Sequence, residues 1–190
     1  FYNFEAAAMV LEGINPPTIE NVAKQAGMAV GPLAVMDEVS IELILKVIAQ
    51  KESLNENENR LKDFFQKMAD AGRLGKKTGK GFYDYPESGK KLLWKNEFVE
   101  VKKDQPISNE DIAKRLMHAM ALDSYRCLEE GVLNTTLDGD IGSMLGLGFA
   151  PHTGGVFSYI DMVGIQEFVA DCDRFLPNGN QWEVPQSLRD

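Results

Sequence analysis

Residues 12–32 read EGINPPTIENVAKQAGMAVGP, and a similar pattern returns at residues 130–151 as EGVLNTTLDGDIGSMLGLGFAP. Each copy has a Glu-Gly pair, then a threonine followed by an apolar and an acidic residue, then a glycine-rich corner that ends in proline. A third block follows in the same order, DEVSI at 37–41 and DMVGI at 161–165. This series predicts two copies of one helical unit, residues 1–103 and 104–190. Each copy is too small to bury its apolar face alone, so we expect the two to pack face to face.

Hydrophobic periodicity predicts an all-α fold. Apolar residues recur with the spacing of one helix face in segments that begin near residues 1, 41, 61 and 165. Longer signals predict a helix from a cap at Ser108 to Gly131 and another from Pro16 to Gly27. The nearest approach to a strand is Phe82–Tyr85, and the polar stretch 51–59 predicts a surface loop. The stripe of the first helix consists of Phe1, Phe4, Ala8 and Leu11.

Composition places the chain among globular proteins. It has 190 residues, 44% of them hydrophobic, and a formal net charge of −9. An acidic surface argues against nucleic-acid binding, since phosphates require a basic one. No apolar run reaches the roughly 18 residues of a membrane span, and the start lacks the basic flank of a signal peptide. We therefore expect a cytoplasmic protein in which Cys127 and Cys172 are reduced thiols.

One segment reverses the sign of the charge. Residues 72–95 contain seven basic and two acidic residues, a local net charge of +5, so the rest of the chain sums to −14. Within it, GKKTGKG at 75–81 resembles a phosphate loop, but it lacks the glycine spacing and the hydroxyl after lysine that a Walker loop needs. A dinucleotide fingerprint fails as well, because Pro151 stands where its third glycine should be. The sequence therefore predicts no nucleotide-binding fold within this chain.

Two histidines are the candidates for a general base. His118 lies beside the apolar stripe of the helix after Ser108 and is expected to be structural or exposed. His152 lies in the glycine-containing loop PHTGG at 151–155, where backbone and ligand can approach closely. Without a pairable nucleophile nearby, a helix-connecting turn is the favoured interpretation. Asp37 and Asp161 hold equivalent places in the third repeated block, which favours a shared cap or turn over two active sites.

Several motifs together resemble one family. They are EG at 12–13, GMAVGP at 27–32 and GKKTGKGFYDY at 75–85. In this combination the first half resembles the C-terminal helical domain of 3-hydroxyacyl-CoA dehydrogenases. The second half contains RCLEEG at 126–131, GLGFAP at 146–151 and GG at 154–155. It resembles the extra copy of that domain in the multifunctional fatty acid oxidation alpha subunit.

The resemblance implies an NAD-dependent enzyme that oxidises the 3-hydroxyl group of an acyl-CoA in fatty acid β-oxidation. In this family a preceding Rossmann domain holds NAD and a catalytic His–Glu pair, and a catalytic asparagine stands just upstream of the position of Phe1. Asn3 does not occupy that place. We therefore expect no catalytic residue, no bound cofactor, no metal and no activity in this chain alone. The implied partners are the Rossmann domain, an acyl-CoA substrate and, as in monofunctional members, a second copy in a homodimer.

The substrate side of this chain is expected at its first glycine-proline corner. Gly31 and Pro32 end one helix and open another with little side-chain bulk, so that a ligand can approach, and Met28 could add an adaptable apolar lining. The sequence leaves two other functions open. One is a non-catalytic docking or dimerisation module, and the other is the helical domain of another two-domain dehydrogenase, such as a 6-phosphogluconate enzyme.

The lysines of residues 72–95 have two possible partners in such an enzyme, the phosphates of CoA and carboxylates of the missing domain. We favour the domain, because a structural tether also explains the neighbouring aromatic residues as packing anchors. These residues are Phe82, Tyr83 and Tyr85.

Overall fold

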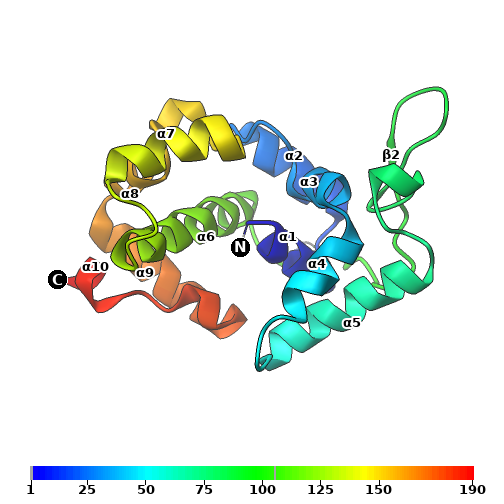
Figure 1. Ribbon diagram of the computed structural model, residues 1–190, viewed down its shortest axis with the longest axis horizontal. Coiled ribbons are helices and arrows are strands. Elements are labelled where there is room, and N and C mark those ends of the chain that lie inside the picture. The colour runs from blue at the N-terminus through cyan, green and yellow to red at the C-terminus, as the bar shows by residue number, and fades with distance from the viewer. Residues whose placement is uncertain (1, 105) are drawn as a thin grey trace. The chain divides into compact units, whose positions relative to one another are not determined.

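The computed structural model describes residues 2–104 and 106–190. Phe1, assigned above to the stripe of the first helix, lies outside the described residues. Helix accounts for 63% of the chain, which confirms the all-α prediction. In chain order the α-helices are α1 (Tyr2–Leu11), α2 (Pro16–Gln25), α3 (Pro32–Val39), α4 (Ile41–Ile48), α5 (Glu56–Asp70), α6 (Asn109–Glu129), α7 (Thr136–Leu147), α8 (Val156–Val163), α9 (Ile165–Phe175) and α10 (Gln186–Arg189) (Figure 1).

Contacts divide the chain into two compact units. The first combines residues 2–5, Val22–Val30 and Ile107–Asp190, and the second consists of Ala6–Asn21 and Gly31–Pro106. The C-terminal half thus folds together with two short segments from the N-terminal half. The division into repeat units at residues 103 and 104 stays a prediction.

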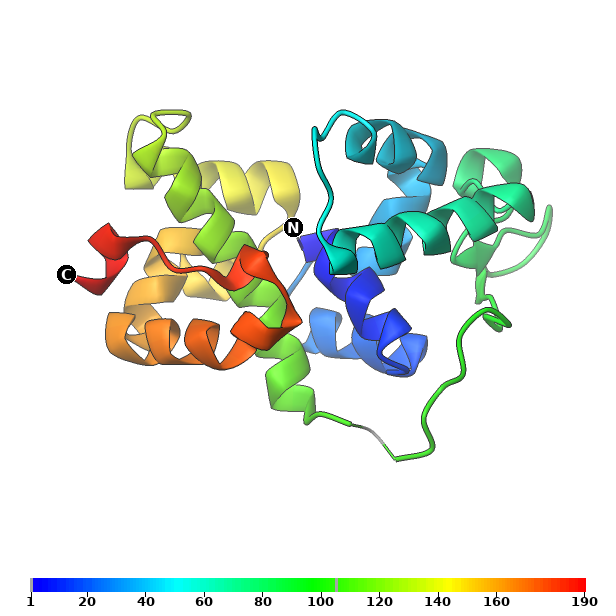
Figure 2. The same cartoon turned by 90° about the horizontal axis from the view of Figure 1, so that it is seen from below.

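The first unit is built around the long helix α6. This helix packs against α8 and α9 (Figure 2). Its core includes Leu116 and Leu122 from α6 and Phe168 from α9, all fully buried. The first turn of α1 joins this core through an ion pair between Glu5 and Arg115, whose side chains are 1% and 2% exposed. The Nε–H group of Arg115 donates to the Glu5 carboxylate at 2.6 Å, so the N-terminal turn is anchored to α6.

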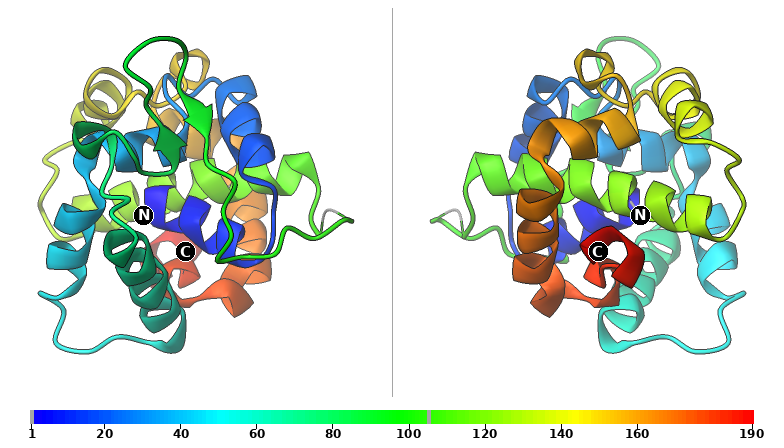
Figure 3. Two further views of the ribbon diagram at one scale, coloured as in Figure 1. Left: turned by 90° about the vertical axis from the view of Figure 1, so that its right-hand side faces the viewer. Right: turned by 90° about the vertical axis from the view of Figure 1, so that its left-hand side faces the viewer.

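The second unit packs α3, α4 and α5 beside a small hairpin. Its strands β1 (Tyr83–Asp84) and β2 (Leu92–Leu93) pair antiparallel, which confirms the strand-like piece expected at residues 82–85 (Figure 3). The loop expected at 51–59 is wrong beyond residue 55, because α5 begins at Glu56. A capping box starts this helix early, since the Asn55 side chain accepts the N–H of Glu58 and the Glu58 carboxylate accepts the N–H of Asn55.

Two pairs of helix ends have the same backbone conformation in both halves of the sequence. Gly13 follows α1 and Gly131 follows α6, with φ of 89° and 71°. Ser40 separates α3 from α4, and Gly164 separates α8 from α9, with φ of 83° and 89°. The helices α3 and α8 have eight residues each. These equivalences support the repeat at both of its ends.

In the middle of the repeat the structure corrects the alignment. The start of α3 corresponds to the start of α8, so Gly31 matches Gly155 and not Ala150. At each place an acidic side chain from the preceding helix caps the new one, Glu20 for α3 and Asp140 for α8. The sequence alignment had matched Glu20 with Asp138, because both follow a threonine by two residues.

Candidate functional site

The predicted substrate-side corner is built around a buried carboxylate. Gly31 and Pro32 are both buried, and Pro32 is the first residue of α3. Glu20 is 2% exposed and accepts a hydrogen bond from the backbone N–H of Leu33 at 2.7 Å, which supplies the cap that a glycine cannot. A Cβ atom on Gly31 would lie 2.2 Å from a Glu20 oxygen. The corner therefore requires glycine, because the capping carboxylate occupies the space of a side chain.

A second carboxylate, Asp37, fixes the other end of α3. It is 1% exposed and accepts hydrogen bonds from the backbone N–H groups of Phe82 and Tyr83, at 2.7 and 2.8 Å. The phenolic hydroxyl of Tyr85 donates to it as well, at 2.9 Å. Burial raises the pKa of Asp37, although these hydrogen bonds favour its charged form. Asp37 therefore joins α3 to the first strand of the hairpin.

Tyr83 connects the two carboxylates. Its backbone N–H donates to Asp37, and its phenolic hydroxyl donates to Glu20. Burial, followed by the hydrogen bond to Glu20, raises the pKa of Tyr83, so the phenol keeps its proton and remains a donor. Arg73 completes the arrangement by donating to the Gly81 carbonyl at 2.8 Å. Residues of the lysine-glycine-aromatic motif thus connect the corner at Gly31 to the hairpin through hydrogen bonds.

The aromatic side chains of this motif pack inside their own unit. The Phe82 ring lies 6.0 Å from that of Phe64 on α5, and the rings of Tyr83 and Tyr85 are 6.2 Å apart. These contacts agree with the prediction that the aromatic residues act as packing anchors. The contacts are made with helices of this chain, however, so these aromatic residues give no reason to assign the neighbouring lysines to a missing domain.

Met28, the third predicted substrate-side residue, belongs to the first unit. It is 4% exposed and follows Gly27, whose φ is 96°. A Cβ atom on Gly27 would lie 2.8 Å from Nδ1 of His152, so the imidazole packs directly against this turn. His152 itself lies in the short 3₁₀ turn Pro151–Thr153, in agreement with the connecting turn expected there. A substrate role for Met28 stays a prediction.

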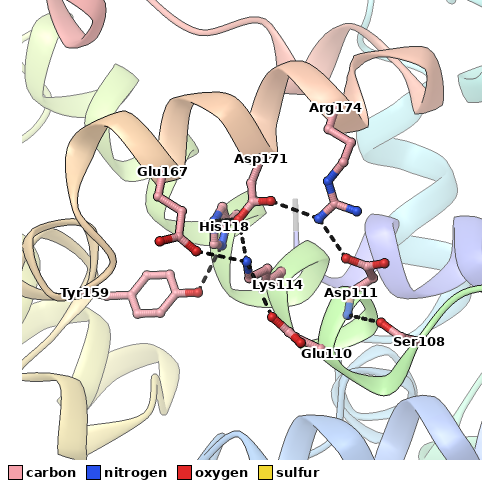
Figure 4. Close-up of polar contacts among 9 residues, drawn as sticks. All are labelled: Ser108, Glu110, Asp111, Lys114, His118, Tyr159, Glu167, Asp171 and Arg174. Atoms are coloured by element: carbon pink, nitrogen blue, oxygen red, sulfur yellow. Dashed lines mark hydrogen bonds and ion pairs between the residues drawn. The ribbon is translucent and has the colours of Figure 1, made fainter.

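His118 is a structural residue. Its side chain is fully buried, and its ring stacks on Phe168 with centroids 4.5 Å apart. Nδ1 and the Tyr159 hydroxyl share a hydrogen bond of 2.9 Å, and Nε2 lies 3.6 Å from Asp171 (Figure 4). Burial lowers the pKa of His118 to about 4 against the opposing charge of Asp171. The imidazole is therefore neutral near pH 7 and closed to substrate.

Cations on both sides compensate the charge of Asp171. Lys114 and Arg174 each approach its carboxylate to 2.8 Å (Figure 4). Burial raises the pKa of Asp171, but the hydrogen bonds from these cations outweigh it and hold the pKa below its usual range. Arg174 also contacts Asp111 at 2.7 Å, and the Asp111 N–H donates to Ser108, which confirms the expected cap. The network ties α6 to α9, so it stabilises the unit and offers no open catalytic group.

Two sequence expectations about acidic residues need correction. Asp161 is exposed on α8 whereas Asp37 is buried, so a shared cap or turn role is wrong. The reason is that the described residues after 106 contain no strand for Asp161 to hold. The capping role of Glu20 was missed, and its signal was the glycine that directly precedes the proline of α3.

Other kinds of site find little support in the described chain. Within residues 2–104 and 106–190, no group of three or more His, Cys, Asp or Glu side chains could hold a metal ion. No helix in the same ranges is long and apolar enough to cross a membrane. Both cysteines are free thiols, with Cys172 buried and Cys127 half-buried.

Comparison with known proteins points to one family. A family model described as "3-hydroxyacyl-CoA dehydrogenase, C-terminal domain" matches residues 1–85, which include both buried carboxylates and the hairpin motif up to Tyr85. The chain is 34% identical to the "Fatty acid oxidation complex subunit alpha" of Shewanella baltica (strain OS185), over 99% of this chain and 27% of that protein. It is also 34% identical to the subunit of the same name from Vibrio campbellii, over 92% of this chain and 25% of that protein. The chain thus spans about a quarter of the length of these relatives.

Solved structures share the fold at low sequence identity. The dehydrogenase part of a multifunctional enzyme from C. elegans matches with a TM-score of 0.68 and 16% identity, over 99% of this chain and 45% of that one. A 3-hydroxybutyryl-CoA dehydrogenase from Escherichia coli matches with a TM-score of 0.66 and 17% identity, over 99% of this chain and 57% of that one. The chain is therefore homologous to the fatty acid oxidation complex alpha subunit, and its residues 1–85 match the 3-hydroxyacyl-CoA dehydrogenase C-terminal domain.

Proposed function

We propose that this chain is the C-terminal, substrate-side and assembly part of an NAD-dependent 3-hydroxyacyl-CoA dehydrogenase that acts in fatty acid β-oxidation. The observation that carries the proposal is the family match over residues 1–85. Homology to fatty acid oxidation alpha subunits over nearly the whole chain supports the same function. The activity, substrate and partners of a complete protein belong to the proposal, because the chain spans only about a quarter of those relatives.

The dinucleotide site has to come from another domain. A Rossmann site needs a parallel strand followed by a glycine-rich turn and a helix. The described residues have two antiparallel strands of two residues each, and the glycines at 146 and 148 lie at the C-terminal end of α7. These residues do not fit NAD. The proposed partner is therefore a Rossmann domain that binds NAD.

The contribution of this chain is a rigid wall on the substrate side. Gly31 and Pro32 form a corner without side-chain bulk, and Glu20 and Asp37 hold the helix that follows it from two ends. Met28 completes the proposed set of residues that line the acyl-CoA. Rigid positioning of substrate contributes to catalysis by reducing the entropy lost on reaching the transition state. A cytoplasmic location and a homodimer belong to the same proposal.

Reconstitution tests the proposal. The chain fused to the segment that precedes it in its own gene should consume NADH with acetoacetyl-CoA, whereas the chain alone should not. The assay follows the loss of NADH absorbance. A well-folded fusion that consumes no NADH but assembles stably would contradict the enzyme proposal and favour a docking module. A preference for free hydroxy acids over CoA thioesters would favour another two-domain dehydrogenase.

A further inference from the structure

The hairpin region of the second unit concentrates exposed positive charge. Residues 72–95 have a net charge of +5 in a chain whose remainder sums to −14. Backbone pairing brings three segments of this region side by side. Lys80 pairs with Asp84 of β1, and β1 pairs with β2, which directly follows Lys91 (Figure 3). The exposed lysines on these segments are Lys76, Lys77, Lys80, Lys90, Lys91 and Lys95.

Few of these charges are used within the chain. Arg73 forms an ion pair with Asp84 at 2.8 Å, and Lys76 forms one with Glu38 at 2.6 Å. Lys91 lies over the Tyr83 ring, 4.3 Å from its centroid. In the described part of the chain, no hydrogen bond or ion pair joins the side chains of the remaining four lysines to another residue. These four are Lys77, Lys80, Lys90 and Lys95.

The fold does not need these lysines. The two buried carboxylates beneath the hairpin are satisfied by backbone N–H groups and phenolic hydroxyls. The aromatic residues beside the lysines pack within the unit, so they do not favour carboxylates of a missing domain over CoA phosphates as the partner of the lysines. These exposed ammonium groups are therefore available to an anionic ligand, and the local excess of positive charge favours one.

We propose that the lysine surface, defined as Lys77, Lys80, Lys90, Lys91 and Lys95, binds the phosphate-rich end of a CoA thioester. This inference rests on the proposed function and deepens it by assigning one end of the substrate. CoA carries a diphosphate and a 3′-phosphate on its ribose, and ammonium groups bind phosphates as point charges without strict geometry. A flexible, exposed set of lysines suits the end of a substrate that stays in solvent. It also attracts an anionic substrate to an otherwise acidic protein.

Calorimetric titration of the 190-residue chain with CoA tests this assignment. The double variant Lys77→Glu/Lys90→Glu should bind CoA about tenfold more weakly, equivalent to about 1.4 kcal/mol. The matched control is Lys62→Glu/Lys67→Glu, which changes the net charge equally at exposed positions on α5 and should bind as the wild type does. Added salt should weaken CoA binding, because exposed charge pairs are screened. All four substituted lysines are exposed, so circular dichroism should show both variants folded.

A second ligand distinguishes binding through the phosphates of CoA from binding through its thiol arm. Pantetheine has the thiol arm of CoA without its phosphates and should not bind. The assignment is overturned if the wild type fails to bind CoA, if both double variants bind CoA equally, or if pantetheine binds as tightly as CoA. Binding of CoA that depends on the lysine surface, in a fusion that consumes no NADH, would refute the proposed dehydrogenase and leave this site standing. An active fusion with unaltered CoA binding in the variant would refute the site alone.

Discussion

Lowering the pH from about 7.5 to about 5 should destabilise this protein through His118. The imidazole is fully buried between Tyr159 and Phe168, and burial lowers its pKa from 6.5 to about 4. The charges of Lys114 and Arg174 act in the same direction, while Asp171 opposes them. Unfolding releases the side chain into water, where it regains its ordinary pKa. The folded and unfolded states therefore differ in proton uptake over a defined range of pH.

The sign and size of the effect follow from this difference. Below pH 6.5 the unfolded chain binds a proton on His118, but the folded chain does not do so until about pH 4. The stability that neutral His118 contributes is therefore fully present above pH 6.5, and it is lost as the pH decreases toward 4. The difference between the two pKa values corresponds to about 3 kcal/mol in full. About 2 kcal/mol of this is lost by pH 5.

Urea denaturation followed by circular dichroism at both pH values measures the effect. The wild type should lose about 2 kcal/mol more than His118→Phe, which cannot titrate, or than His118→Gln, which keeps a polar partner for Tyr159. The raised pKa values of Asp37 and Asp123 give pH dependence of the opposite sign, but they are present in every protein compared and so cancel. Equal pH dependence of the wild type and both His118 variants would refute the argument.

Three further predictions concern buried polar contacts within each unit. Gly31→Ala should lower the free energy of unfolding by about 1–3 kcal/mol, because its Cβ would overlap the capping carboxylate, whereas Gly142→Ala, where nothing lies within 4 Å, should lower it by none. Asp37→Ala should abolish hydrogen-exchange protection of the two amides that it accepts in the hairpin, and unchanged protection would contradict its role. Arg115→Ala should cost about 3–5 kcal/mol by leaving the buried Glu5 carboxylate without its cation. Arg189→Ala, which breaks an exposed pair, should cost no more than about 1 kcal/mol, and equal losses from the two arginine variants would rule out this account.

The helices with a clear apolar stripe could be predicted from the sequence. Periodicity located α4, α5 and α9, because each of them buries one face and exposes the other. The cap at Ser108 marked the start of α6, whose residues 115–119 are all buried. It missed α7, whose sequence TLDGDIGSMLGL contains three glycines and apolar residues on all sides. Leu145 on this helix is 84% exposed and Leu137 is 64% exposed, so its apolar residues do not mark a buried face. A pattern method has no signal for such a helix, and only its cap at Thr135 marks where it begins.

The candidate site is held together by contacts between residues far apart in the sequence, which local sequence patterns cannot predict. Glu20 meets Tyr83 across 63 positions of the sequence, and Asp37 meets Phe82 across 45. Composition marked the glycines and lysines of the motif but not the carboxylates behind them. Similarity between the two glycine-rich corners that end in proline also made the sequence alignment wrong, because proline can start either an α-helix or a 3₁₀ turn. The capping acid and the glycine that makes room for it are the better markers of the repeat.

Stability and the proposed binding of CoA depend on different side chains of the hairpin region, so substitutions can separate them. Glu20 and Asp37 are buried, and neutral donors from the backbone and from tyrosines satisfy them. Nearly all of the lysines therefore remain outside this network and reach solvent. Removal of a carboxylate should unfold the hairpin without regard to any ligand, whereas reversal of lysine charge should leave the fold intact and change only the binding of an anion. A variant of Lys77 or Lys90 that lost hairpin structure would break this separation and, with it, the assignment of the lysine surface to CoA.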